Sequence, residues 1–200
     1  MATKIFELKI QLNDVSKPPI WRKVEVAASD TLYDLHNIIQ GAMGWHNGHL
    51  HQFIIYDDHY GIPSPDDFME VHDERKYKLS KIFLNLKQKI KYEYDFGDGW
   101  IHTVTLEAVK DLEKGIKYPL LTKGKSMCPF EDCGGVWGYM ELRETLNNPK
   151  HSDYEDMREW VGMQEDEFFD PAHFDIDMQT KNMIAAYDAG KKSKGKEFMF

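Results

Sequence analysis

Cysteine is scarce in this sequence: the 200 residues include only Cys128 and Cys133. Two cysteines are too few for a disulfide framework, and a bridge across so short a loop would constrain the unfolded chain only modestly. Their spacing also differs from the Cys-x-x-Cys spacing of structural zinc sites, and there is no second pair to complete a four-cysteine site. We therefore expect two reduced thiols.

Long apolar segments are absent as well. No run of about 18 apolar residues, the length that a membrane-spanning helix needs, occurs in the chain. Met1 to Asn13 alternates apolar and charged or polar residues, whereas a signal peptide carries a continuous apolar segment. The glycine-rich phosphate loops of the P-loop and dinucleotide types are also missing. We expect a cytoplasmic protein with no membrane partner and no nucleotide cofactor.

Basic residues are too few to balance the acidic ones. The chain has 25 lysines and arginines against 34 aspartates and glutamates, a net charge of −9. Between Asp153 and Asp177, ten acidic residues are accompanied by a single basic residue, Arg158. Such a surface repels phosphates at close range. Bulk DNA binding is therefore not expected, and any contact with nucleic acid must lie elsewhere.

What the chain does contain is enough apolar material for a folded core. Hydrophobic residues make up 42% of the sequence and aromatic residues 13%, unlike the aromatic-poor composition of disordered chains. A chain of this length supports one sizeable core. We expect one domain and a disordered basic tail over residues 191–200.

The N-terminal half has the pattern of strands around one helix. Apolar residues alternate over residues 5–12 and again over residues 20–26, with Pro18-Pro19 between, which predicts a hairpin. Three N-cap residue types at 29–31 precede apolar residues at helical spacing that continue to Gly44, which predicts an amphipathic helix. A strand is expected over Leu50 to Tyr56, followed by a long surface loop over Asp57 to Lys76.

A second hairpin and a helical C-terminal part follow. Lys89 to Phe96 and Trp100 to Val109 are strand-like, and Gly97-Asp98-Gly99 between them supplies the positive φ angles of a tight turn. Helices are expected around residues 139–146, 154–160 and 176–187. The predicted fold is a single α+β domain. Its antiparallel-rich sheet is built from a hairpin, a helix, a strand and a hairpin, with further helices in the C-terminal part.

Three stretches carry residues suited to chemistry, and the first contains two histidines. If His49 and His51 lie on a strand, their side chains point to the same face, as a metal-binding pair requires. The alternative is structural: one histidine caps the turn while another packs against Trp45.

The second stretch is the tip of the predicted hairpin. It brings Asp98 close to His102, and a carboxylate can fix the tautomer of a histidine that acts as a base or a metal ligand. Aspartate is also a standard turn residue that binds nearby backbone N–H groups, so Asp95 and Asp98 have an equally good explanation as turn formers.

The third stretch, Cys128 to Gly135, holds the carboxylates of Glu131 and Asp132 and the thiols of Cys128 and Cys133. A cysteine nucleophile would need one of the histidines close by as a base. The structural alternative is a loop in which Gly135 permits close backbone approach and Cys133 is buried. A fourth candidate is Arg22, which we expect to pair with a carboxylate; a ligand-binding role is its alternative.

Five stretches occur in order: Pro19-Ile20-Trp21-Arg22; a helix with Leu35-His36 that ends in Gly44-Trp45; His49-Leu50-His51-Gln52-Phe53; Tyr92 to Trp100 with His102; and Glu131-Asp132-Cys133-Gly134-Gly135. On these motifs the chain resembles the Ri-plasmid open-reading-frame-three-like family, from about Lys4 to about Tyr187. The resemblance implies a single domain related to plasmid- and transposon-associated proteins, some of them passengers of insertion elements, and to free-standing archaeal and bacterial domains. It implies no established activity.

Two features depart from the family pattern. The family usually has a proline pair directly before the position of Glu131, where this chain has Pro129-Phe130. Cys128 also falls outside the shared pattern, which weakens the case for Cys128 as a ligand or a reactive thiol. An association of genes with mobile elements is not a physical argument for DNA binding by an acidic chain.

Three functional hypotheses remain open. The first is a noncatalytic binding module whose pocket, walled by Trp45, Trp100 and the loop with Glu131, Asp132 and Cys133, holds a peptide, a protein or a nucleic-acid end, with Arg22 as a further ligand-binding residue. The second is a metal-dependent hydrolase, with phosphodiesters as one substrate class. It would use a divalent metal such as zinc on His49, His51 and His102, with Asp98 or Glu131 as base or orienting group. The third is a domain whose motifs serve only the fold. Convergence of the histidines and Glu131 within about 4 Å of one point would favour the metal site.

Overall fold

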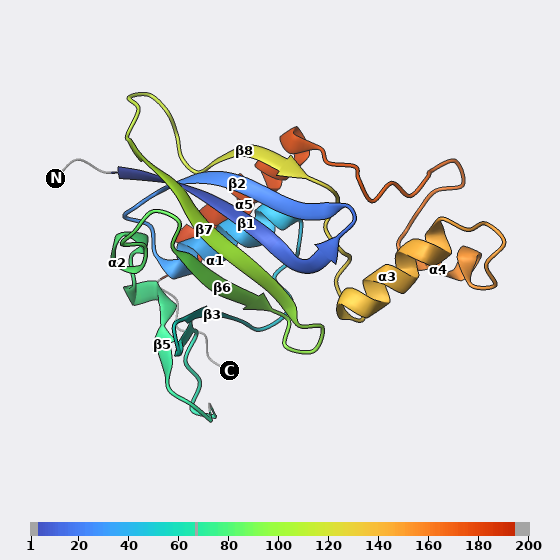
Figure 1. Cartoon of the computed structure of the whole chain (residues 1–200), viewed down its shortest axis with the longest axis horizontal. Helices are drawn as coiled ribbons and strands as arrows, with labels where there is room; N and C mark the ends of the chain where they lie inside the picture. Colours follow the sequence, from blue (N-terminus) through green and yellow to red (C-terminus); the bar gives the residue numbers. More distant parts are fainter. Residues whose placement is uncertain (1–3, 67, 195–200) are drawn as a thin grey trace.

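Eight strands form one sheet in the computed structural model, which describes residues 4–66 and 68–194 (Figure 1). The strands are β1 (Lys4–Ser16), β2 (Pro19–Ala27), β3 (His51–Ile55), β4 (Asp58–Gly61), β5 (Val71–Asp73), β6 (Lys89–Tyr94), β7 (Trp100–Asp111) and β8 (Leu120–Lys125). Their spatial order is β5-β4-β3-β6-β7-β1-β2-β8. In this described sheet β4 and β5 run parallel, and all other neighbouring strands run antiparallel.

Both predicted hairpins are present. Every second residue is buried throughout β2 and from Phe6 to Leu12 in β1, and Ile5 pairs with Ala27 in a register that continues to Gln11 and Trp21. The second hairpin joins β6 to β7, and its turn uses a positive φ angle at Gly99 (68°) and also at Asp95 (57°). The long β7 strand pairs with β1 on its other side, so the two hairpins share one core.

The described residues also form six helical segments, and the longer ones lie on one face of the sheet or beyond its edge. They are α1 (Leu32–Met43), the 3-10 helix η1 (Glu74–Lys76), α2 (Leu79–Ile82), α3 (Gly135–Leu146), α4 (Tyr154–Trp160) and α5 (Ile176–Ser193). α1 and α5 pack together behind the sheet, whereas α3 and α4 lie to one side of it (Figure 1). The α+β prediction is therefore confirmed.

The helix α1 is the centre of the core. All of its residues are buried, because its apolar face contacts the sheet and its other face is covered by α5. Thr31 and Asp34 form a capping box at its start, where each side chain accepts the other's backbone N–H, at 3.3 Å for Thr31 Oγ1 and 2.8 Å for Asp34 Oδ2. The helix ends at Gly44 in the left-handed conformation, with a φ of 96°.

Two segments with no strand prediction contain strands. The segment Asp57 to Lys76, expected to be a surface loop, includes β4, β5 and η1, and it places Glu74 in the interior with no exposed surface. The edge strand β8 also lies in a segment with no strand prediction. Both segments are rich in glycine, proline and charged residues, and it is pairing with an existing strand, β3 or β2, that makes them extended.

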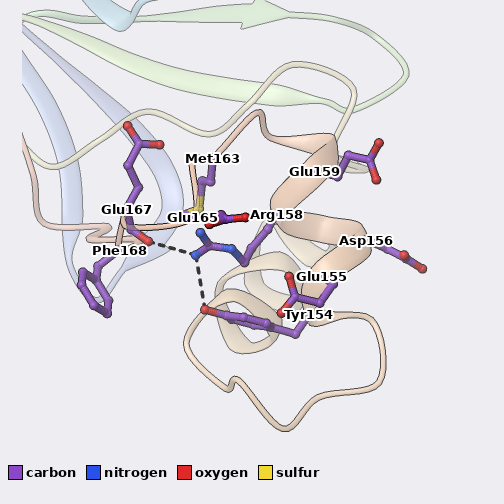
Figure 2. Close-up of a pocket in the computed structure, with 9 residues that line it drawn as sticks. All are labelled: Tyr154, Glu155, Asp156, Arg158, Glu159, Met163, Glu165, Glu167 and Phe168. Carbon is purple, nitrogen blue, oxygen red and sulfur yellow. Dashed lines mark hydrogen bonds between the residues drawn. The ribbon is translucent and has the colours of Figure 1, made fainter.

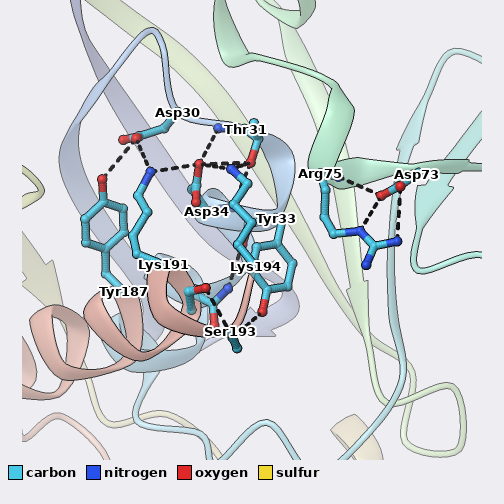
Figure 3. Close-up of polar contacts among 12 residues, drawn as sticks. Asp30, Thr31, Tyr33, Asp34, Asp73, Arg75, Tyr187, Lys191, Ser193 and Lys194 are labelled. Carbon is cyan, nitrogen blue, oxygen red and sulfur yellow. Dashed lines mark hydrogen bonds and ion pairs between the residues drawn. The ribbon is translucent and has the colours of Figure 1, made fainter. Parts of the chain in front are cut away.

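The C-terminal helix is longer than expected, which corrects the prediction of a disordered tail beginning at Lys191. Lys191 Nζ lies 3.0 Å from both Asp30 Oδ1 and Asp34 Oδ2, and Lys194 Nζ lies 2.8 Å from Asp34 Oδ2 (Figure 3). The two buried carboxylates need counter-ions, and these lysines provide them. The rest of the predicted tail, residues 195–200, lies outside the described residues.

Within the described ranges, no helix is both long enough and apolar enough to span a bilayer.

Candidate metal centre

Three segments that are far apart in the sequence meet at one end of the sheet: the loop between α1 and β3, the tip of the β6–β7 hairpin, and the loop before α3. Glu131 joins the first and third, because its Oε2 accepts the backbone N–H of His46 at 3.0 Å. Its other oxygen, Oε1, accepts a short hydrogen bond from the Tyr94 hydroxyl at the end of β6. That hydroxyl in turn accepts the backbone N–H of Gly48 at 3.0 Å. Glu131 therefore fastens the three segments together.

The hairpin tip and the loop before α3 are also in direct backbone contact. The Gly134 N–H donates to Asp98 Oδ2 at 3.3 Å. A Cβ atom at Gly135, whose φ is 68°, would lie 2.4 Å from the Asp98 carbonyl oxygen. Only glycine fits there, so the expected close approach at Gly135 is present. Trp45 adds a bond from its Nε1 to the Pro129 carbonyl at 3.0 Å.

At this junction one histidine lies between two aspartates, one from each of the other segments. His49 Nε2 is 3.2 Å from Asp132 Oδ1, and His49 Nδ1 is 3.6 Å from Asp95 Oδ2. One ligand atom from each residue can be chosen so that all three lie within 4.8 Å of one another. The side chain of Asp95 is 11% exposed, that of His49 29% and that of Asp132 71%, so the group opens to solvent on the Asp132 side. We call these three residues the His49 cluster.

Local geometry fixes the inner carboxylate of the cluster. Asp95 Oδ1 accepts the backbone N–H of Gly97 at 2.9 Å and that of Asp98 at 3.3 Å, the pattern of an Asx turn. This holds the Asp95 carboxylate in one orientation and leaves Oδ2 directed to His49. The turn-forming role expected for Asp95 and its place in the cluster are thus compatible.

The His49 cluster offers one imidazole nitrogen and carboxylate oxygens, which are ligands that zinc and manganese accept. Two ligands of a tetrahedral zinc ion, each bound at about 2.1 Å, lie about 3.4 Å apart. The separations of 3.2 and 3.6 Å involve the two different ring nitrogens of His49, and a single ion would bind only one of them. With one ligand atom taken from each residue the separations are up to 4.8 Å, so the three side chains must move closer together to bind one divalent cation.

The other two histidines of the predicted metal trio lie elsewhere. His51 begins β3 and turns inward, where its ring stacks on that of His36, with centroids 3.4 Å apart, and its Nε2 lies 3.0 Å from Glu74 Oε1. His49 precedes the strand, so the alternation that would place both side chains on one face does not apply. His102 is fully buried, with Nδ1 3.1 Å from the Trp100 carbonyl. Burial lowers the pKa of His51 to about 3 and that of His102 to about 4.

The remaining candidate residues serve mainly to build the site. Trp100 is fully buried and Trp45 is 6% exposed, so both indole rings belong to the core, where Trp45 stacks on Tyr94 at 4.9 Å. Both cysteines are free thiols, and burial raises the pKa of each to about 12. Such thiols remain protonated and are poor nucleophiles.

Arg22 corrects one expectation, because its guanidinium pairs with no carboxylate among the described residues. It donates instead to three backbone carbonyls: Nε to Ala42 at 2.7 Å, and Nη1 to Trp21 at 3.0 Å and to Lys125 at 2.9 Å. Backbone carbonyl oxygens at the end of α1 and on the edge strand β8 take the place of the expected carboxylate.

The acidic C-terminal segment contains a separate surface cavity of about 580 Å³ beside α4 (Figure 2). Its one basic residue, Arg158, donates through Nη1 to the Tyr154 hydroxyl at 3.3 Å and to the Glu167 carbonyl at 2.9 Å (Figure 2). Arg158 therefore holds the loop after α4 in place. The cavity shares no residue with the His49 cluster.

The sequence and the fold are shared with known proteins. Residues 4–178 match the family described as plasmid pRiA4b ORF-3-like protein. The uncharacterized protein y4hQ of Sinorhizobium fredii (strain NBRC 101917 / NGR234) is 36% identical over 163 residues, which are 81% of this chain and 83% of that protein. A crystal structure of MM3350, a protein of unknown function from Methanosarcina mazei Go1, has 37% identity and a TM-score of 0.77, covering 88% of this chain and 98% of that one. With most of both chains matched, this protein belongs to the plasmid pRiA4b ORF-3-like family.

Proposed function

We propose that this protein is a noncatalytic binding module that holds one divalent cation, zinc or manganese, at His49, Asp95 and Asp132. The observation that carries the proposal is the meeting of these three side chains, from three separate segments, with ligand atoms within 4.8 Å of one another. Two carboxylates held this close repel each other, and a bound cation removes that repulsion.

The exposure of the His49 cluster supports a role in binding. Asp132 is 71% exposed, so the cation would face solvent. Three protein ligands leave at least one coordination position for water or for an oxygen atom of a partner. A peptide, a protein or a nucleic-acid end could supply that oxygen, whereas the acidic body disfavours extended DNA.

The neighbouring carboxylates favour binding over hydrolysis. A metal-dependent hydrolase needs a base near the ion, and Asp98 and Glu131 are the candidates. Both oxygens of Glu131 accept hydrogen bonds, from His46 and Tyr94, and one oxygen of Asp98 accepts the Gly134 N–H. These contacts support a role for Glu131 and Asp98 in holding the loops together.

Calorimetric titration of the metal-free protein with zinc or manganese chloride tests the proposal. We expect one ion per chain, and we expect His49→Ala and Asp132→Asn each to weaken binding by about 10-fold or more. The matched control is His151→Ala, which removes a surface histidine 4.0 Å from Asp153. Equal affinity in all four proteins, or no binding by any of them, would refute the proposed site.

A further inference from the structure

A second site lies around Arg22, away from the His49 cluster. Arg22 has no exposed surface, and its Nη2 is buried without a hydrogen-bond partner. Its other two nitrogens donate to backbone carbonyls, so no negative charge among the described contacts compensates the guanidinium. Burial lowers its pKa to about 10, which still leaves it charged at neutral pH. A buried, unpaired cation is costly unless an anion reaches it.

Arg22 forms part of the wall of a cavity of about 430 Å³. The cavity lies between the end of α1, the loop before α3 and the start of α5. Its apolar lining includes Met43, Trp45, Met127, Phe130, Phe174 and Met178. This volume lies within the range of small-ligand sites, about 300–1,000 Å³, and an apolar wall with one fixed charge is typical of them.

Of the described residues that line the cavity, none neutralises Arg22. Burial raises the pKa of the Cys128 thiol to about 12, so it stays neutral. Glu131 is bonded to Tyr94 and His46, and Asp175 caps α5 by accepting the Met178 N–H at 2.9 Å. His46 and His173 also line the cavity and carry no negative charge. An anionic ligand in the cavity would supply the missing negative charge.

The charges in the cavity wall favour a singly charged anion. Only Nη2 of Arg22 remains to donate, so the two-nitrogen fork that binds carboxylate or phosphate is not free and an anion would contact one nitrogen. The carboxylates of Glu131 and Asp175 in the wall would repel a doubly charged phosphate more strongly than a carboxylate. The ring of Phe174 lies 4.3 Å from the guanidinium carbon and offers an apolar surface beside the charge.

We propose that this cavity binds the carboxylate of an organic acid that carries an apolar group. The carboxylate contacts Arg22 Nη2 after side chains in the wall shift to uncover that atom, and the apolar group packs against the methionine and aromatic side chains. The acid could be a free small molecule or the C-terminus of a peptide, since both present the same chemistry.

Methionine methyl NMR locates the site, because Met43, Met127 and Met178 line the cavity and Met140 lies exposed on α3. The probes are N-acetylphenylalanine and its uncharged amide. We expect the acid to shift the three lining methyl signals but not that of Met140, and to bind at least about 10-fold more tightly than the amide, as expected for a hydrogen bond to a charged group. Equal binding of acid and amide, shifts elsewhere, or no shifts would overturn the proposal.

Two further comparisons complete the test. Arg22→Gln should abolish the shifts caused by the acid, whereas Arg143→Gln, which removes an exposed guanidinium that also binds a carbonyl, should retain them. If Arg22→Gln does not fold, the comparison of N-acetylphenylalanine with its amide on the unaltered protein still tests whether the carboxylate is recognised. Tighter binding of the peptide Gly-Gly-Gly-Phe than of the small acid identifies a peptide C-terminus, and the reverse order identifies a free acid. Inorganic phosphate that displaces both would overturn the choice of a carboxylate.

Discussion

The imidazole rings of His36 and His51 lie parallel in the interior, with centroids 3.4 Å apart and planes inclined by 7°. Two imidazolium ions cannot be stacked at this distance without strong repulsion, so the two rings are not both charged. Burial lowers the pKa of each to about 3, and the neighbouring ring contributes to the shift at His36. His36 also contacts the Tyr92 hydroxyl at 2.8 Å and Asn47 Oδ1 at 2.9 Å. The pair is thus part of a buried polar network.

This network predicts that acid destabilises the fold between about pH 6.5 and pH 4.5. In that range the unfolded chain protonates His36, His51 and His102 while the folded chain does not, so stability falls as pH falls. Glu74 opposes this trend, because burial raises its pKa to about 7 and stability is therefore gained as it is protonated. On unfolding in this range, the three histidines take up protons and Glu74 releases one, a net uptake of about two protons. The free energy of unfolding therefore falls by about 2.7 kcal/mol for each pH unit of acidification.

Denaturant unfolding at several pH values checks this expectation. His51→Gln should reduce the slope of stability against pH, because one buried imidazole is removed. A free energy of unfolding that is constant between pH 6.5 and pH 4.5 would show that the histidines are not held neutral.

The ion pairs between α5 and the start of α1 predict that Lys191→Met destabilises the protein. Asp30 and Asp34 are 5% and 2% exposed, and each lies 3.0 Å from the Lys191 ammonium (Figure 3). Removing this partner leaves buried carboxylates with less compensation, and we expect a loss of about 1–3 kcal/mol. The matched control is Lys4→Met, whose pair with Asp111 is exposed and should contribute no more than about 1 kcal/mol. Equal losses of unfolding free energy for the two variants in urea denaturation would contradict this role of Lys191.

The packing of α1 on α5 predicts that Gly41→Ala is strongly destabilising. A Cβ atom there would lie 2.5 Å from the Met183 Cα and 2.6 Å from the Asn182 carbonyl oxygen, which are backbone atoms that cannot rotate away. The helices would have to separate, at a cost of about 1–3 kcal/mol or more. Gly48→Ala is the control, because no atom lies within 4 Å of a Cβ built at Gly48. Thermal melts that show similar losses for both variants would mean that α1 and α5 are not packed this closely.

The position of Glu131 predicts an indirect effect on metal affinity. Glu131 is not in the His49 cluster, but it precedes Asp132 and anchors that loop to His46 and Tyr94. Glu131→Gln keeps the size of the side chain and weakens both bonds, so we expect an affinity loss of about 10-fold with one ion still bound per chain. A complete loss of binding would instead make Glu131 a ligand, and an unchanged affinity would show that this anchor does not position Asp132.

Much of the fold could be predicted because its signals are local. Alternating apolar residues in β1 and β2, the N-cap before α1 and the glycines of the β6–β7 turn each determine structure within a few residues. β8 could not be predicted in this way, because it is extended only through pairing with β2, about 100 residues earlier. β4 and β5 pair with β3 and β4, which are close in the chain, but they lie in a segment rich in Asp, Pro and Gly that has no strand pattern. The sequence predicts a disordered tail from Lys191 onward, because the partners of the tail lysines, Asp30 and Asp34, lie about 160 residues earlier in the chain.

The sequence predicts which three stretches form the candidate site but not which of their residues meet. All three stretches contribute to the junction, but the residues that converge are His49, Asp95 and Asp132, whereas the predicted trio was His49, His51 and His102. The strand begins at His51, so the ring of His51 turns inward to His36 and not toward His49. Asp95 could be recognised as a turn former, but its free oxygen could be matched to His49 only in three dimensions.

The most direct test of the metal site is a crystal of the zinc-loaded protein measured at and below the zinc absorption edge. We expect one anomalous difference peak bounded by His49, Asp95 and Asp132, with ligand distances of about 2.0–2.2 Å. A peak at any other group of side chains, or no peak after zinc loading, would contradict the assignment of this junction as a metal centre.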